Sequence, residues 1–514
     1  MPAKPKIKLN KMKIKIISIL IASLFTLNCV GQVNLNLSGI TTRKFSNKIP
    51  KGTQIHVNRI IENARGSVDV ELSVNNEIQY CSYGELKNIS FEANSITDLW
   101  TIEALNREVY ETLINNGFQN EVRAEYDKEA NEYFKFLKGN NLIFEDQFLE
   151  SYISTLLSKI YPDKLKDGRA SSLNIHIRKD NEPNAFIFPN GTLFISTGLL
   201  STINSEDELI GVLAHEITHM VLDHSIVNYI EEQKREQRGM FWSAIATGAV
   251  AAAEVVMASK NEYYIPGNLT LTTAMLARDV SQRINKRLGI LCSQNQEYEA
   301  DEVACKVLIF LKKDKYALSS ALQKIKNSLV ESGNYNSLEN GSETHPAIEN
   351  RIKEIGLRII PIDNNYMKNI SFVTSYNAME AFIEQNLELC KDLVEKNINV
   401  SVATQDDYIL ISKVTLLTKD DKESNAKALE YIAKAKKYKN LTNINLYKQE
   451  ALVYIRLKNK EEGKISLEKY LELVSAEKSK LEKIKNEKYW LQFSAYCDKE
   501  SEWTINMIDK IEQL

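Results

Sequence analysis

The sequence predicts an α+β protein with a small β domain, a mainly helical middle domain with a small β-hairpin, and a helical C-terminal domain. Three observations support this class. Short runs of alternating residues, broken by turn signals, extend from residue 33 to about 94 and are typical of short strands. From Ile96 onward the apolar residues recur with the period of a helix. Within the helical part, two apolar runs flank Pro189-Asn190-Gly191, a turn signal that predicts a hairpin.

Residues 1–32 have the composition of a signal peptide. An apolar run, Ile16–Leu27, follows a basic stretch, and it is too short for an ordinary transmembrane helix. We expect cleavage after Gly31 and therefore an exported protein in the periplasm or cell envelope. A lipid anchor on Cys29 and an uncleaved membrane anchor remain alternatives, and Met12 could be the true start. The basic stretch contains six lysines: Lys4, Lys6, Lys8, Lys11, Lys13 and Lys15.

Charge and cysteine content exclude some classes of partner and site. Removal of the six N-terminal lysines changes the net charge from −3 to −9, and no basic cluster occurs elsewhere, so we expect no nucleic-acid partner. Five cysteines remain, and they are scattered without a C-x-x-C pair. The sequence therefore indicates neither a disulfide framework nor a cysteine zinc site.

Residues 33–95 form the predicted β domain, a small barrel or sandwich. The strand-like runs are GTQIHVNRII, SVDVELSV and EIQYCSY, and Asn-Asn and Lys-Gly pairs separate such runs. The end of this segment, IQYCSYGELKNISF, resembles bacterial SH3-like modules. His56 stands alone in a predicted strand, and we assign it a structural role.

Residues 96–360 form the predicted middle domain. Its first part contains three amphipathic helices, Leu99–Asn115, Ala124–Phe136 and Phe144–Ile160, followed by a strand at Leu173–Arg178. The hairpin comes next, with strands at Ala185–Phe188 and Thr192–Ser196.

The most informative segment is Gly211–Ser225, GVLAHEITHMVLDHS, which contains His215, Glu216 and His219 as H-E-x-x-H. Residues four apart lie on one face of a helix, so both imidazoles can bind a single zinc ion. Glu216 stands beside them, where it can take a proton from the attacking water. A chance occurrence on a surface helix is the alternative, but six histidines in 514 residues rarely produce this spacing.

A zinc protease site needs a third protein ligand and one open position. The longer pattern with Gly and His six residues on is absent, because Leu222 and Ser225 stand at those positions; His224 is one residue short and lies well round the helix. The better candidate is Glu297, in QNQEYEADEVA. Asp301 follows four residues later on the same helix face, where it can accept the outer ring N–H of a ligand histidine. A solvated acidic patch is the alternative for this pair.

H-E-I-T-H followed by E-Y-E-A-D resembles the M48 family of zinc metallopeptidases. Two flanking motifs extend the likeness: NAFIFPNGTLFISTGLL at residues 184–200 and HPAIENRI at residues 345–352. The resemblance covers roughly Asp98 to Ile360. It implies a mainly helical zincin-type metalloprotease domain with one zinc ion per chain.

The resemblance also implies roles for further residues. An edge strand borders the substrate cleft in such folds, which implies that a peptide binds beside Asn184 and along Thr192, Leu193, Phe194, Ile195 and Ser196. Arg351 would hold the cleft or the substrate backbone; an ion pair with a nearby carboxylate is its alternative. His345 would hydrogen-bond the developing oxyanion.

An uncharged run of small and apolar residues, GMFWSAIATGAVAAA, begins at Gly239. We interpret the segment 239–258 either as a helix packed in the middle domain or as a helix that contacts a membrane surface or guards the cleft. A membrane span is disfavoured because the run is short and Glu254 follows it.

Residues 361–514 are rich in lysine and glutamate with helical apolar spacing. A tetratricopeptide-like pattern of alternating large and small residues predicts helical repeats, which bind protein partners in a concave groove. A plain helical bundle is the alternative. The pattern consists of Tyr447, Ala451, Tyr454, Gly463, Leu467 and Tyr470, with a partial earlier copy at Ala428, Ile432 and Ala435.

The sequence thus predicts an exported zinc endopeptidase that hydrolyses peptide bonds in unfolded or misassembled envelope proteins. His215, His219 and Glu297 would hold the zinc, and Glu216 would act as the general base. Two other functions stay open: a latent protease that binds partners through its helical repeats, and a membrane-embedded protease of the same type.

Overall fold

The computed structural model describes residues 32–45, 49–62, 68–115, 119–161, 165, 168–169, 172–235, 292–331, 348–441, 443–482 and 487–513. Residues 1–31 of the predicted signal peptide, the segment 239–258 and His345 lie outside this part of the chain, so those predictions remain untested. Within the described residues, no helix has the length and apolar character needed to cross a membrane.

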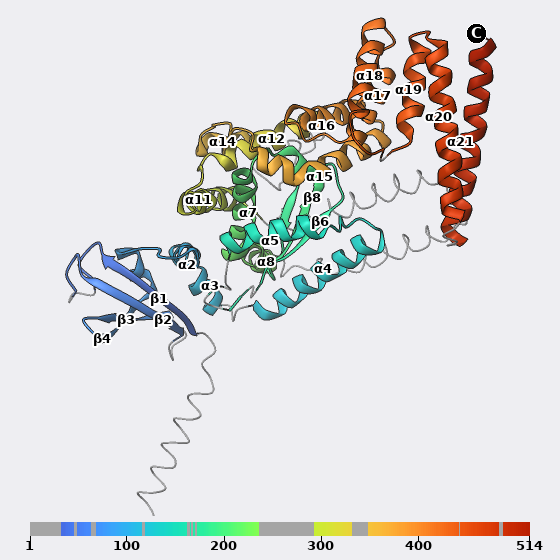
Figure 1. The fold of residues 1–514 in the computed structure, drawn as a ribbon. Coiled ribbons are helices and arrows are strands. Elements are labelled where there is room, and N and C mark those ends of the chain that lie inside the picture. The colour runs from blue at the N-terminus through green and yellow to red at the C-terminus, as the bar shows by residue number, and fades with distance from the viewer. Residues whose placement is uncertain are drawn as a thin grey trace, which may run out of the picture.

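The N-terminal domain contains one antiparallel sheet with strand order β4-β3-β2-β1-β5 (Figure 1). Every second side chain of β1 is buried, as alternation in the sequence requires when one face of a sheet covers a core. A short 3-10 helix, η1, connects β4 to β5. The elements are β1 (Gln32–Thr41), β2 (Gln54–Glu62), β3 (Val68–Val74), β4 (Glu77–Ser82), η1 (Tyr83–Asn88) and β5 (Ile89–Phe91).

The first predicted helix, Leu99–Asn115, is in fact two helices. Glu108 has a left-handed backbone (φ 60°), which no continuous helix permits, and it separates α2 (Ile96–Asn106) from α3 (Val109–Asn115). The Tyr83 hydroxyl donates to the carbonyl of Leu105 at 2.9 Å, and the indole N–H of Trp100 donates to that of Ile160 at 2.8 Å. Helix α2 therefore joins the β domain to the middle domain.

The middle domain contains a three-stranded sheet with order β6-β8-β7, in which β6 and β8 are parallel and β7 and β8 antiparallel. An aromatic cluster that includes Tyr133 of α4 and Phe194 of β8 packs helix and sheet together. The elements are α4 (Asn120–Gly139), α5 (Gln147–Ile160), β6 (Asn174–Arg178), β7 (Ala185–Ile187), β8 (Thr192–Ser196), α6 (Thr197–Thr202), α7 (Glu206–Val221), α8 (His224–Arg235), α11 (Gln294–Phe310), α12 (Ala317–Glu331) and α14 (Ile348–Ile355).

The C-terminal part is a row of helices that stand side by side (Figure 1). Consecutive helices pack against one another, most extensively α15 with α16, α17 with α18, α19 with α20, and α20 with α21. The residues of the predicted repeat lie on α18, α19 and α20; the tetratricopeptide assignment stays a prediction. The helices are α15 (Asn364–Ile383), α16 (Leu387–Asn399), α17 (Gln405–Thr418), α18 (Lys422–Ala435), α19 (Asn445–Arg456), α20 (Lys460–Glu482) and α21 (Glu487–Gln513).

The core does not end at the predicted boundary between residues 360 and 361. Tyr366, Met367 and Ile370 of α15 are completely buried in the same hydrophobic cluster as the helices of the middle domain. The Tyr366 hydroxyl also donates to the carbonyl of Leu200 in α6 at 2.7 Å. Helix α15 is therefore part of the middle domain's core, although it follows the predicted boundary. The predicted α+β class, with mainly helical content and small sheets, is confirmed.

Candidate metal centre

Helix α7 carries the H-E-x-x-H motif, and its sequence fixes its start and its position. Ser205 caps the helix by accepting a hydrogen bond from the backbone N–H of Glu208, and the acidic first turn suits the positive end of the helix dipole. A Cβ atom on Gly211 would lie 3.1 Å from the backbone nitrogen of Leu318. The glycine therefore lets α12 approach α7 closely, and this contact helps to hold α7 in the core.

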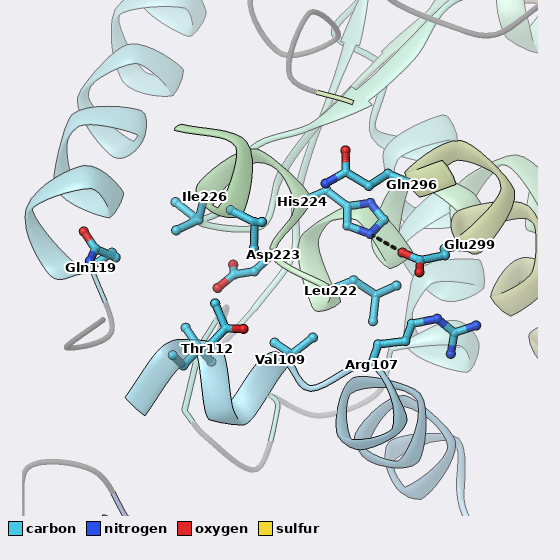
Figure 2. Close-up of a pocket in the computed structure, with 12 residues that line it drawn as sticks. Arg107, Val109, Thr112, Gln119, Leu222, Asp223, His224, Ile226, Gln296 and Glu299 are labelled. Atoms are coloured by element: carbon cyan, nitrogen blue, oxygen red, sulfur yellow. Dashed lines mark ion pairs between the residues drawn. The ribbon is translucent and has the colours of Figure 1, made fainter. Parts of the chain in front are cut away.

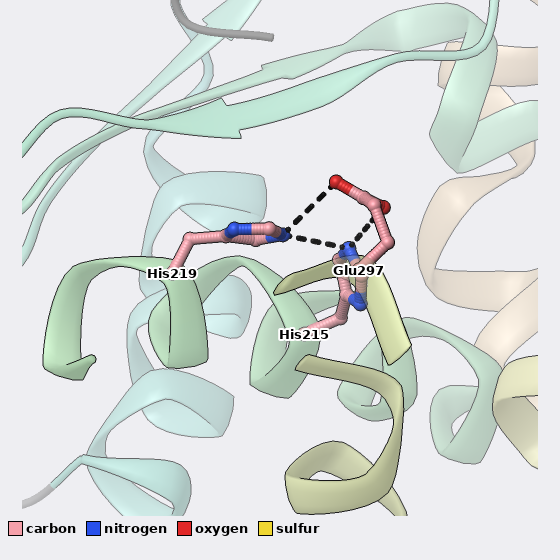
Figure 3. Close-up of side chains that lie close together, drawn as sticks. All are labelled: His215, His219 and Glu297. Atoms are coloured by element: carbon pink, nitrogen blue, oxygen red, sulfur yellow. Dashed lines mark hydrogen bonds and ion pairs between the residues drawn. The ribbon is translucent and has the colours of Figure 1, made fainter. Parts of the chain in front are cut away.

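Three side chains from α7 and α11 converge at one point (Figure 3). The Nε2 atoms of His215 and His219 lie 3.1 Å apart, and each lies 3.5 Å from a carboxylate oxygen of Glu297. All three residues are buried, and one potential ligand atom from each lies within 4.8 Å of the others. Within the described residues, this is the cluster whose donor atoms could hold a metal ion.

The spacing of these atoms suits a tetrahedral zinc ion. Zinc binds nitrogen and oxygen at about 2.0–2.2 Å, so two tetrahedral ligand atoms are separated by roughly 3.3 Å. The observed separations of 3.1 and 3.5 Å lie on either side of that value. Two imidazoles and one carboxylate also form a ligand set that leaves one coordination position for water or substrate. The cluster therefore fits zinc in both spacing and chemistry.

Comparison with known proteins identifies the part of the chain that carries this cluster. Residues 164–359 match the sequence model of peptidase family M48. This part of the chain is similar to that family. The predicted resemblance is thus confirmed, although the match begins later in the chain than the predicted start near Asp98.

Similar proteins are named as proteases. The mitochondrial metalloendopeptidase OMA1 of Schizosaccharomyces pombe is 32% identical over 121 residues, which are 23% of this chain and 35% of that protein. The beta-barrel assembly-enhancing protease of Escherichia coli K12 is 26% identical over 224 residues, 43% of this chain and 41% of that protein. A protease HtpX homolog of Fusobacterium nucleatum is 29% identical over 137 residues. The chain thus matches less than half the length of these relatives.

In the M48 segment, the outer nitrogen of His215 contacts an ion pair. Nδ1 of His215 lies 2.9 Å from an oxygen of Asp301, and the Arg351 guanidinium donates to both Asp301 oxygens at 2.6 and 2.8 Å. Another nitrogen of the same guanidinium lies 2.9 Å from Glu297. Arg351 is thus ion-paired, as its alternative interpretation predicted, and it is also adjacent to the ligand cluster.

These charges shift the pKa values of the groups that they surround. Burial lowers the pKa of His215, and Arg351 lowers it further, but hydrogen bonds to Asp301 and Glu297 outweigh both effects and raise it to about 9. Burial raises the pKa of Asp301, yet Arg351 and His215 hold it below its ordinary value. In the metal-free protein, a protonated His215 therefore pairs with an ionised Asp301.

The outer nitrogen of His219 contacts His224, which the sequence did not predict as a site residue. Nδ1 of His224 lies 3.0 Å from Nδ1 of His219, and Sγ of Cys292 lies 3.3 Å from the same atom. His224 is not part of the ligand cluster, as predicted, but the expectation that it lies well round the helix is wrong, because α7 ends at Val221 and Asp223 has a left-handed backbone (φ 60°). A histidine just beyond the end of a motif helix, at a chain reversal, is the signal that could have indicated this contact.

The structure corrects the predicted cleft strand and places two further predicted site residues, Asn184 and Glu216. Thr192–Ser196 was predicted as the edge strand of the cleft, but β8 is the central strand, paired with β6 and β7, and all five of its residues are buried. Its backbone cannot accept a further strand, so the direct peptide-binding role of these residues is wrong. Asn184 precedes β7, and its carbonyl accepts from the backbone N–H of Ser196. Glu216 is partly exposed on α7, next to His215.

Proposed function

We propose that this chain is a zinc-dependent endopeptidase. One observation carries the proposal: His215, His219 and Glu297 present their ligand atoms within 4.8 Å of one another, in an M48 segment with a partly exposed glutamate beside the cluster. When bound there, zinc would supply Lewis acidity, which polarises a peptide carbonyl and lowers the pKa of water.

The protein's own residues would handle the proton and orient the cluster. Glu216 takes the proton of the attacking water and delivers it to the leaving amine, the role that its position beside His215 permits. Asp301 accepts the Nδ1 proton of His215, which leaves Nε2 of that ring as a ligand. Arg351 balances the charge of Asp301 and Glu297 in the buried site.

An extended peptide would bind at β7, which is an edge strand of the described sheet and contacts α7. Ser196 N–H donates to the carbonyl of Asn184, and Phe188 N–H donates to that of Thr192, so residues 184 and 188 direct backbone groups toward β8. In an antiparallel ladder such residues alternate with residues that face the other way. The backbone groups of Ala185 and Ile187 therefore point to the open edge. A peptide held there by its backbone is selected only weakly by sequence.

We further propose that the protein is exported and acts on unfolded or misassembled proteins of the cell envelope. The basic and apolar N-terminal segment supports export. The name of the Escherichia coli relative, a beta-barrel assembly-enhancing protease, supports an envelope role. The paired helices beyond α15 offer a surface for a protein partner, which would supply the selectivity that the peptide edge lacks.

Replacement of Glu216 by Gln tests the catalytic proposal. The variant should bind one zinc ion per chain and keep its melting temperature, yet lose cleavage of an unfolded model protein, because an amide cannot take the proton. Glu206→Gln, at the first turn of the same helix, is the matched control and should cleave normally. Turnover near the wild-type rate in Glu216→Gln would show that another group handles the proton. If Glu216→Gln keeps the full cellular role, the latent binding module is the better description.

Truncation tests the division of roles between the helices. A chain ending after Asn399 keeps α15 and α16 on the core, so it should cleave unfolded protein but no longer select its native target. A chain ending after Ile360 removes Tyr366 and Met367 from the core and should be unstable to heat. Native processing at the full rate by the chain that ends after Asn399 would remove the recognition role from α17–α21.

A further inference from the structure

We propose that His224 is a positioning residue for the metal ligand His219. It accepts the proton on Nδ1 of His219 and so keeps Nε2 of that ring free to bind the metal. This inference rests on the zinc site of the proposed function. It assigns a role to a residue that the H-E-x-x-H motif does not contain.

A bound metal would require one particular tautomer of His219. Its Nε2 atom faces the ligand cluster, 3.1 Å from Nε2 of His215 and 3.5 Å from Glu297. A neutral imidazole carries one proton, and the ligand nitrogen must have none, so the proton of His219 must be on Nδ1. That N–H is buried and needs an acceptor. Nδ1 of His224, at 3.0 Å, is correctly placed to accept it.

The tautomer of the second ring, His224, follows from that of His219. If Nδ1 of His224 accepts, the single proton of a neutral His224 must be on Nε2. Nε2 of His224 lies 3.4 Å from Oε2 of Glu299, as the dashed line in Figure 2 shows. The hydrogen bond thus runs from His219 to His224, and the remaining N–H of His224 lies at ion-pair distance from the carboxylate of Glu299 on α11. The ring of His224 stands between the ligand imidazole and this carboxylate.

The chain holds His224 firmly in this place. Asp223 adopts the left-handed conformation that reverses the chain between α7 and α8, and its carboxylate forms ion pairs with Arg123 and Arg169. His224 begins α8 and is 3% exposed. Because two arginines hold this reversal and the ring of His224 is buried, His224 has little freedom to turn away from His219.

Cys292 is the competing acceptor for the same proton. Its sulfur lies 3.3 Å from Nδ1 of His219, but a thiol sulfur is a weak acceptor and an imidazole nitrogen is a strong one. His224 and Glu299 also line a cavity of about 150 Å³, whose lining includes none of the three metal ligands (Figure 2). The contact between His224 and Glu299 is therefore separate from the cluster and can be altered without filling the metal position.

Two conservative substitutions separate positioning from packing. The amide oxygen of Asn can occupy the place of Nδ1 in histidine, whereas the longer Gln places its amide near the position of Nε2. We would measure zinc affinity by competition with a chelator for the wild type, His224→Asn, His224→Gln, His224→Phe and Cys292→Ala. The absorption spectrum of each Co²⁺-substituted protein reports the ligand field independently of activity.

The wild type, His224→Asn and Cys292→Ala should bind zinc within about threefold of one another. His224→Gln and His224→Phe should bind zinc about 10–100-fold more weakly, the usual range for the loss of a group that orients a metal ligand. Their Co²⁺ spectra should change, whereas that of His224→Asn should match the wild type. If His224→Phe does not fold, the comparison of Asn with Gln still decides the matter.

Two results would overturn the proposal: equal zinc affinity in His224→Asn, His224→Gln and the wild type, or loss of affinity in Cys292→Ala alone. Failure of the proposed function looks different, because the wild type itself would then bind no zinc. Tight zinc binding by the wild type with no effect of any His224 variant would reject only the role of His224.

Discussion

The two ligand histidines stand four residues apart on one helix, yet the structure supports them in different ways. The outer nitrogen of His215 meets the carboxylate of Asp301, which is paired in turn with Arg351. The outer nitrogen of His219 meets the imidazole of His224 and the thiol of Cys292. The carboxylate of Asp301 supports the ring of His215 directly. The ring of His224 stands between the ring of His219 and the carboxylate of Glu299.

The difference follows from the cost of burying charge. A buried carboxylate is costly unless a counter-charge accompanies it, so the support of His215 needs Asp301 from α11 and Arg351 from α14. An imidazole is buried more cheaply and needs only hydrogen bonds. His224 follows His219 by five residues, so this support comes from the adjacent chain. The support of His215 thus comes from two distant helices, whereas the support of His219 comes from the adjacent turn, which two distant arginines hold in place.

The largest effect should come from Glu297, which both sides share. Glu297→Ala removes a direct ligand, so zinc affinity should fall by more than about 100-fold, beyond the range for a group that only orients a ligand. Zinc content after dialysis checks this outcome. Glu302→Ala, on the same helix, is the control and should keep its zinc. A fully zinc-loaded Glu297→Ala protein would show that Glu297 is not a metal ligand.

The next effect concerns the ionic support of His215. Asp301→Ala should weaken zinc binding about 10–100-fold, and it should destabilise the fold by up to about 3–5 kcal/mol because it breaks a buried charge pair. The double variant Asp301→Ala/Arg351→Met should be less stable than Asp301→Ala alone, because Arg351 also pairs with the buried Glu297 and its loss takes the arginine from that carboxylate. Denaturant unfolding of the zinc-free proteins measures this difference. Equal stability of the single and double variants would contradict the ionic description.

Zinc affinity should depend on pH because zinc binding removes a proton from His215. In the zinc-free protein the pKa of His215 is about 9, above its unfolded value of about 6.5, so zinc must displace a proton from it at neutral pH. Zinc affinity should therefore rise about tenfold per pH unit through this group between pH 7 and 9. The stability that the protonated ring gives the zinc-free fold is fully present below pH 6.5 and is lost as pH rises through 9. Chelator competition across this range checks the first expectation, and an affinity that does not change with pH would contradict it.

The smallest effect should come from Glu299, at the outer end of the His219 side. Glu299 is partly exposed, and Glu299→Gln keeps an oxygen that can accept the Nε2 proton of His224. Zinc affinity should stay within about threefold of the wild type. A loss of zinc affinity in Glu299→Gln as large as that in Asp301→Ala would mean that carboxylate charge, and not hydrogen-bond geometry, supports both histidines.

Local patterns determined much of this protein. The spacing of His215 and His219 places both rings on one helix face regardless of context, and Glu297 with Asp301 repeats the same four-residue geometry on α11. The helical period and the hairpin turn predicted the α+β class for the same reason, because short-range backbone geometry is written into adjacent residues. The structure brings these two pairs together, so that Glu297, the candidate third ligand, lies beside both histidines.

Tertiary packing decided what local patterns could not. An apolar run such as Thr192–Ser196 has the same sequence pattern in a central strand as in an edge strand. Only the pairing of β8 with β6, in addition to β7, makes β8 the central strand. The helical period of α15 did not reveal that Tyr366 packs under α6, so the predicted boundary at residue 360 cuts through one core. The contact between His219 and His224 depends on a left-handed Asp223 held by two arginines that are distant in sequence. Each of these outcomes rests on contacts between segments far apart in the chain, whose free energy no local pattern records.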